Sequence, residues 1–135
     1  MPAEDRMPGS PPDWLHRARS DLNLARLSRP EGVLLEDLCF HAQQAAEKAL
    51  KAVLVANSVA VPNIHSIRRL IDLLPAKLDI PGEVQDAASL TDYAVSSRYP
   101  GDFEPVDEDE HREAVRLAEA VVSWVADLIG EEEEH

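Results

Sequence analysis

The longest stretch of this sequence that can form one regular element runs from Leu34 to Ala56 and contains neither proline nor glycine. Its length is enough for about six turns of α-helix. Apolar side chains recur alternately three and four residues apart along it, which places them in one line on a helix. These positions are Leu35, Leu38, Ala42, Ala45, Ala49, Ala52 and Ala56. The stretch therefore predicts one long helix around which the remaining chain packs.

The apolar line of this helix consists only of alanine from Ala42 onward. Because an alanine side chain is a single methyl group, a neighbouring helix can approach closely. Polar residues form two further rows, which we expect to face water or a partner. One row holds Asp37, His41, Gln44, Lys48 and Lys51, and the other holds Glu36, Gln43 and Glu47. Glu47 precedes Lys51 by four residues, a spacing that supports an ion pair on a helix.

Four other segments show helical spacing of apolar residues, at about 13–27, 64–74, 83–97 and 107–130. The candidate N-caps are Asp13 for the first, Asn63 or Ser66 for the second, and Asp107 or Asp109 for the last. No segment shows the two-residue alternation of a β-strand. The predicted class is all-α, an up-and-down four-helix bundle with an additional short helix.

The predicted bundle spans residues 13–130. Residues 1–12 contain four prolines and almost nothing apolar to bury, so we expect a disordered N-terminal arm. Residues 131–135 read EEEEH and form a predicted acidic tail. The few aromatic residues leave the core to Leu, Val, Ile and Ala, with Trp14 and Trp124 expected as core anchors.

The formal net charge of −13 is concentrated near the C-terminus. Residues 102–135 contain 13 acidic side chains against Arg112 and Arg116, a balance of −11, which leaves −2 for residues 1–101. A net negative charge repels nucleic acid at long range. A site for RNA must therefore be a local basic pocket.

Several classes of protein are disfavoured by what the sequence lacks. The single cysteine, Cys39, cannot form an internal disulfide or a Cys-rich zinc site, and its apolar neighbours indicate a buried, inert thiol. No glycine-rich phosphate loop, HExxH or GxSxG motif is present, and we expect neither metal nor cofactor. No 18-residue apolar run or signal peptide occurs, so we expect a cytoplasmic protein without membrane contact.

Three motifs stand out as a set: FHAQQAAEKALKAVL on the long helix, NIHSIRRLIDLL on the short helix, and LTDYAVSSRYPGDFEPV between the last two helices. In this order and spacing they resemble the prokaryotic HEPN domain family over roughly residues 13–129. The resemblance implies a helical bundle that commonly forms homodimers and is often encoded beside a small nucleotidyltransferase. Many family members that cleave RNA carry an arginine followed four to six residues later by a histidine.

This RNase motif is incomplete here. Arg98 matches its arginine, but Phe103, Glu104 and Pro105 stand where the histidine is expected. Histidine can accept or donate the proton that metal-independent RNA cleavage must move near neutral pH. His41, His65 and His111 are the alternatives that folding could bring close. The sequence therefore favours a protein that is not an RNase.

The segment joining the last two predicted helices combines a cation, two aromatic residues and acids, which a simple connection does not need. We expect Arg98, Tyr99 and Asp102 to lie at the mouth of a groove together with residues of the long helix. Arg98 suits phosphate, whereas Tyr93 and Tyr99 can stack on a base or simply pack at the edge of the bundle. The candidate site is completed by His41, Gln44 and Lys48, which share one helix face and suit either a dimer interface or a polar pocket.

Three functions remain open at this point. The first is a homodimeric module that associates with nucleotide or RNA and acts with a separately encoded small nucleotidyltransferase, as in toxin-antitoxin or stress and defence pairs. The second is a metal-independent RNase toxin with a divergent active site. The third is a helical dimerisation module without nucleotide function.

Overall fold

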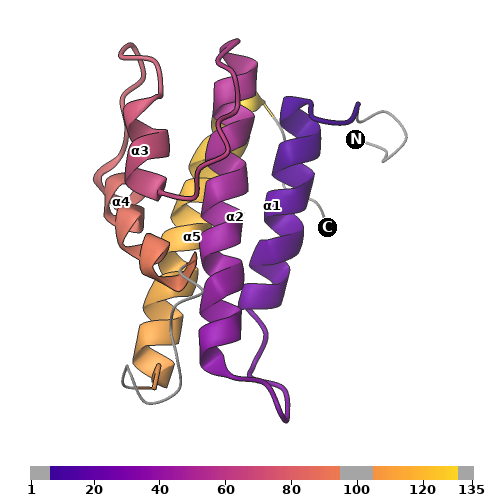
Figure 1. The fold of residues 1–135 in the computed structure, drawn as a ribbon, viewed down its shortest axis with the longest axis vertical. Coiled ribbons are helices and arrows are strands. Elements are labelled where there is room, and N and C mark those ends of the chain that lie inside the picture. Colours follow the sequence, from indigo (N-terminus) through magenta and orange to yellow (C-terminus); the bar gives the residue numbers. More distant parts are fainter. Residues whose placement is uncertain (1–6, 95–104, 131–135) are drawn as a thin grey trace.

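The computed structural model describes residues 7–94 and 105–130 (Figure 1). Within these residues the regular elements are all helical and no strand occurs. The helices are α1 (Pro11–Ala25), α2 (Leu35–Ala56), α3 (Ile67–Asp72), α4 (Gly82–Asp86), the 3₁₀ helix η2 (Ala87–Ala94) and α5 (Glu108–Ile129). The predicted all-α class is confirmed.

The helices alternate in direction along the long axis of the molecule. In Figure 1, α1 descends, α2 ascends, α4 and η2 descend, and α5 ascends again. The additional short helix is α3, which lies with α4 on the side of α2 away from α1. Helix α2 packs against α1, α3, η2 and α5. The long helix identified in the sequence is therefore the central element of the up-and-down bundle.

Helix α1 begins at Pro11, two residues before the predicted start. Ser10 is its N-cap, and the Ser10 hydroxyl oxygen accepts a hydrogen bond from the backbone N–H of Asp13 at 3.3 Å. Pro11 and Pro12 fit the first turn because proline has no N–H group to satisfy there. Asp13, the predicted cap, instead accepts a hydrogen bond from the backbone N–H of Gly9 at 3.0 Å, and this bond lowers the pKa of Asp13.

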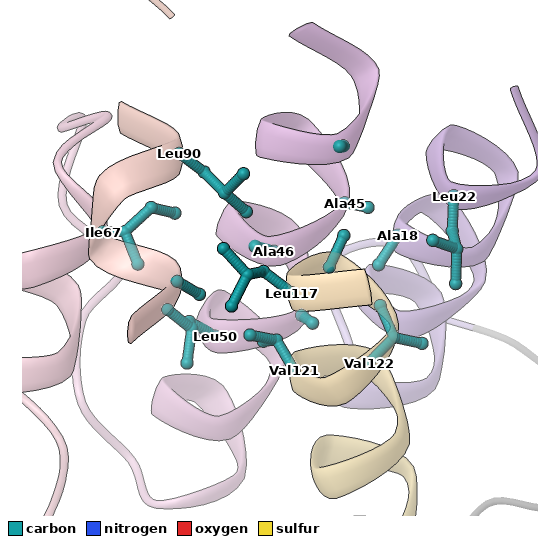
Figure 2. Close-up of a cluster of buried hydrophobic side chains, with 14 of the residues drawn as sticks. Ala18, Leu22, Ala45, Ala46, Leu50, Ile67, Leu90, Leu117, Val121 and Val122 are labelled. Atoms are coloured by element: carbon teal, nitrogen blue, oxygen red, sulfur yellow. The ribbon is translucent and has the colours of Figure 1, made fainter. Parts of the chain in front are cut away.

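The alanine line of α2 is buried along its length except at Ala56, which is exposed at the end of the helix. Ala45 and Ala18 lie where α2 meets α1, and Leu50 and Val121 lie where α2 meets α5 (Figure 2). Cys39 is also buried, as predicted. Trp14 and Trp124 are only partly buried and pack against the core from its edge. Helices that meet through alanine leave too little space between them for an indole ring.

The segment predicted as one helix over 83–97 has a different local geometry. Of its residues up to 94, which the structure describes, the α-helical ones belong to Gly82–Asp86, and Ala87–Ala94 continues as a 3₁₀ helix. A 3₁₀ helix has three residues per turn, so residues three apart share a face. Ala87 and Leu90 are buried on that face, and Tyr93 packs against the core after them.

The caps of α3 and α5 are among those the sequence offered. The Ser66 hydroxyl oxygen accepts from the N–H of Arg69 at 3.2 Å, and the Asp107 carboxylate accepts from the N–H of Glu110 at 2.8 Å. Helix α3 starts at Ile67 rather than near Ile64. No helix in the described part of the chain is long and apolar enough to cross a membrane.

Candidate functional site

The predicted site residues fall into three groups. Arg98, Tyr99 and Asp102 lie outside the described residues. His41, Gln44 and Lys48 lie on α2, on the side that meets α1, and Tyr93 lies near the end of η2.

Asp21 of α1 holds two of the predicted residues together. Its carboxylate lies 3.0 Å from Nδ1 of His41 and 2.6 Å from Nζ of Lys48. Asp21 is buried, whereas His41 and Lys48 are partly exposed. Because an ionised carboxylate only accepts hydrogen bonds, Nδ1 of His41 is assigned the proton and Nε2 remains for another partner. Lys48 likewise keeps two of its three N–H donors.

A second polar network lies farther along α2, and its members on that helix are buried. Glu47 pairs with Nζ of Lys51 at 2.9 Å and accepts hydrogen bonds from Nε2 of Gln43 and Nδ1 of His65, both at 3.0 Å. The exposed fractions of Gln43, Glu47 and Lys51 are 0%, 3% and 5%. Nε2 of Gln44 donates to Oε1 of Gln43 at 2.7 Å, next to both networks. We call this whole set the polar face: Asp21, His41, Gln43, Gln44, Glu47, Lys48, Lys51 and His65.

Part of the polar face is covered by the connector 57–66. In Figure 1 this segment descends in front of α2 before α3 begins. Nε2 of Gln43 also donates to the backbone carbonyl of His65 at 3.2 Å, which fastens the connector to α2. On the other side, the ammonium of Lys51 lies 5.8 Å from the ring centroid of Trp14, within cation–π range.

Two opposing effects act on the pKa of Glu47. Burial alone would raise the pKa, because it disfavours the charged carboxylate. Hydrogen bonds from Gln43, Lys51 and His65 favour the charged form and together lower the pKa below its ordinary value. Glu47 is therefore held as an ionised carboxylate within the protein.

The expectation that both polar rows of α2 face water or a partner is wrong for Gln43, Glu47 and Lys51. The connector and Trp14 cover them, and both are contributed by other parts of the chain. A local signal for Glu47 did exist, since it lies three and seven residues before the buried Leu50 and Leu54, in the same line on the helix. The predicted ion pair between Glu47 and Lys51 is confirmed.

Asp21 is a site residue that the sequence reasoning missed. It follows Ala18 by three residues and precedes Ala25 by four, so it stands in the buried line of α1. An acidic residue in such a line needs a partner of opposite charge. The position of Asp21 in this buried line could be read from the sequence. Its partners, His41 and Lys48, could not, because they depend on how α1 packs on α2.

Tyr93 belongs to a different region from the polar face. It borders a pocket of about 270 Å³ between η2 and α5, and its hydroxyl donates a hydrogen bond to Glu110. The charged residues among the described lining of this pocket are all acidic: Asp92, Glu110 and Glu113. Such a lining disfavours the phosphate of a nucleotide.

The remaining histidine considered above, His111, has a structural position. It is buried, and its Nε2 donates to the backbone carbonyl of Ala25 at 2.7 Å, which satisfies a carbonyl at the C-terminal end of α1. Among the residues that the structure describes, no group of three His, Cys, Asp or Glu side chains could hold a metal ion.

Comparison with known proteins establishes the family. The sequence model of the HEPN domain family matches residues 12–131 of this chain. The chain belongs to the HEPN domain family.

Two solved structures support this assignment. The protein TT1696 from Thermus thermophilus is 35% identical, with a TM-score of 0.77 over 88% of this chain and 98% of that one. ST0689, an archaeal HEPN homologue, is 29% identical, with a TM-score of 0.70 over 89% of this chain and 98% of its own. No match was found among curated proteins.

Proposed function

We propose that this HEPN domain is a binding and partner module rather than an RNase. It forms a homodimer through its long helices, associates weakly with a nucleotide or RNA, and acts with a separately encoded small nucleotidyltransferase, as in toxin-antitoxin or stress and defence pairs. The observation that carries the proposal is the placement of His41, His65 and His111. Each of them could have replaced the catalytic histidine that is missing after Arg98. Each instead makes a contact within the fold: with Asp21, with Glu47 and with the carbonyl of Ala25, respectively.

In none of these three contacts is one histidine the partner of another, so the contacts do not form a pair of proton-transferring groups. His65 binds Glu47 and its backbone carbonyl binds Gln43, so it fastens the connector to α2. His111 closes the end of α1 through Ala25. Cleavage of RNA without a metal needs one group to accept the 2′-hydroxyl proton and another to protonate the leaving oxygen.

His41 favours a second candidate function, the RNase with a divergent site. A buried carboxylate orients its ring through Nδ1, as in a catalytic His–Asp pair, and Nε2 remains for substrate. Lys48 beside it could stabilise charge on a phosphate. Within the described residues, no hydrogen bond joins His41 to His65 or His111, which bind Glu47 and Ala25 instead, so the binding module remains the first candidate.

We expect no metal-independent cleavage of structured or unstructured RNA by the purified protein in the presence of a chelator. A missing acid or base lowers the rate of such a reaction by a factor of about 10² to 10⁴. Gel analysis of labelled RNA provides the measurement. Cleavage that disappears in both Arg98→Ala and His41→Gln, but persists in the exposed-site control Lys77→Gln, would establish the RNase instead.

The dimer is proposed from exposed apolar side chains where α1 leads into α2. Leu24, Leu27 and Leu34 are large, apolar and exposed. Such residues on one region of the surface are typical of interaction sites. A second copy can cover them through the same surface, as twofold symmetry requires.

Sedimentation equilibrium at micromolar concentration is expected to give twice the mass of the 14.9 kDa chain. Leu24→Glu should shift the protein toward the monomer, because a charge would be buried in the interface. Leu73→Glu, at an exposed leucine of the region after α3, is the matched control and should leave the dimer intact. A monomer in the wild type contradicts the dimer. Co-purification with a neighbouring nucleotidyltransferase tests the partner separately.

A further inference from the structure

We propose that the connector 57–66 opens as a unit while the bundle stays folded, and that the contacts of His65 hold it closed. In the closed form the connector covers the buried charges of Glu47 and Lys51. In the open form these charges face water or a partner. The opening is independent of the nucleotide, dimer and nucleotidyltransferase proposals above.

Both ends of the connector are fixed to helices. At its start, the backbone N–H of Val59 donates to a carbonyl in the last turn of α2 at 2.9 Å. Ser58, the residue before it, has a φ of 61°, in the left-handed region, and there the chain turns out of α2. Just beyond the connector, the backbone N–H of Ile67 donates to the hydroxyl oxygen of Thr91 at 3.0 Å. The part that can move is therefore limited to residues 60–65.

Few contacts hold this middle part in place. Among the described residues, the backbone groups of residues 60–65 form no hydrogen bond with another backbone group. The hydrogen bonds that join this part to α2 come from His65, whose carbonyl accepts from Gln43 at 3.2 Å and whose Nδ1 donates to Glu47 at 3.0 Å. Ile64 packs against the core but is only partly buried. Residues 60–65 are therefore held mainly through His65.

The surface beneath the connector is polar, which makes uncovering it less costly than uncovering an apolar core. Glu47 and Lys51 pair with each other at 2.9 Å and can keep this pair in the open form. Water can then solvate the carboxylate, the ammonium and the amide of Gln43, which offsets part of the contacts that are lost. We therefore expect the opening to need less free energy than unfolding of the bundle.

Opening changes what this face of the protein offers to a partner. The closed form leaves His41, Gln44 and Lys48 of α2 partly exposed. The open form adds the carboxylate of Glu47 and the ammonium of Lys51. A molecule that contacts either of these groups must bind the open form, and it shifts the population toward that form by its differential affinity. The connector thus controls access to a charge pair that the closed protein hides.

The side-chain amide of Gln43 is a direct probe of the opening. Its N–H groups are buried and donate to Glu47 and to the carbonyl of His65, so in the folded bundle they can exchange with water only when the connector leaves. The experiment is hydrogen exchange of the full chain, followed by NMR at increasing urea below the unfolding transition. Exchange at Gln43 should be nearly independent of urea, because a local opening exposes little surface. Exchange of the backbone N–H of Leu50, in the buried part of α2, should accelerate with urea.

A variant of the core separates local opening from unfolding. Leu117 of α5 is buried, and Leu117→Ala should speed exchange at Leu50 by at least about 30-fold, as expected for a buried leucine reduced to alanine. The same variant should leave exchange at Gln43 unchanged, because the closed and open forms share the core of the bundle.

Variants of the connector test the part played by His65. His65→Ala should speed exchange at Gln43 by about tenfold, since a hydrogen bond to a charged group is lost. His65→Asn places an N–H donor close to the position of Nδ1 and should restore most of the protection. Asn63→Ala changes an exposed residue of the same segment, and this matched control should exchange as the wild type does.

Two results would overturn the opening. One is exchange at Gln43 with the same urea dependence as at Leu50, and the other is an equal acceleration of both by Leu117→Ala. Each would mean that the connector leaves α2 only when the bundle unfolds. The first of these is measured on the wild type, so no variant has to fold for it. An unchanged rate at Gln43 in His65→Ala would overturn the role of His65.

Discussion

Replacing Glu47 by alanine is expected to lower the free energy of unfolding by about 3–5 kcal/mol. The substitution leaves the ammonium of Lys51, only 5% exposed, without its carboxylate, and removes the acceptor for Gln43 and His65. An uncompensated charge in a buried position is costly because water cannot solvate it. A small domain has about 5–15 kcal/mol of stability in total, so the effect is severe. Urea denaturation followed by circular dichroism gives the value.

The matched control is Asp72→Ala, which breaks the exposed pair of Arg68 and Asp72 at the same four-residue spacing. That change should cost less than about 1 kcal/mol. Replacing Glu47 and Lys51 together by leucine and methionine should recover much of the loss, because an apolar pair needs no solvation. If Glu47→Ala costs no more than Asp72→Ala, the buried network does not stabilise the fold.

The same carboxylate makes the stability depend on pH in a defined direction. The pKa of Glu47 is lower in the folded protein than its ordinary value, so the folded state favours the ionised form. Its contribution is complete above the unfolded pKa of about 4.5 and is lost as the pH falls through the folded pKa. Glu47→Gln should therefore flatten the acid side of the stability profile in that range.

Leu50→Ala is expected to cost about 2–5 kcal/mol, the range found when a buried leucine is reduced to alanine. Leu50 is fully buried on α2 and lies near Val121 of α5 (Figure 2). A closely packed core relaxes only partly around a truncated side chain, so relaxation should recover little of the loss.

Leu73→Ala removes the same atoms from an exposed position and should cost less than about 0.5 kcal/mol. Both variants are compared with the wild type by urea denaturation. The comparison holds if all three proteins show the same m-value, the slope of the unfolding free energy against urea concentration. A cost for Leu50→Ala that matches Leu73→Ala would mean that the core around α2 is not closely packed.

The sequence predicted the fold well where one helix face decides burial. The alanine line of α2 and the caps Ser66 and Asp107 follow from local spacing and cap chemistry. The 3₁₀ helix η2 did not follow, because its period is set by docking of Ala87 and Leu90 on the core. The burial of Glu47 and Lys51 was also missed. Glu47 does stand in line with the buried Leu50 and Leu54, but the groups that cover Glu47 and Lys51 come from a connector and from Trp14, which are distant in sequence.

The candidate site was only partly predictable for the same reason. Spacing on one helix grouped His41, Gln44 and Lys48, and the structure joins two of them through Asp21. Asp21 lies on another helix, and its role depended on how α1 and α2 pack. The groove proposed around Arg98, Tyr99 and Asp102 lies outside the described residues and stays a prediction. Tyr93 proved to face acidic residues, which local spacing could not show.

The 3₁₀ geometry of η2 sets the length of this side of the bundle. A 3₁₀ helix rises about 2.0 Å per residue and an α-helix about 1.5 Å, so the eight residues of η2 span roughly 16 Å instead of 12 Å. Conversion to α-helix would shorten the segment by about 4 Å. It would also rotate Tyr93 relative to Ala87 by about 120°, since six residues make two full turns in one geometry and fewer in the other. The hydrogen bond between Tyr93 and Glu110 joins the end of η2, in this longer form, to α5.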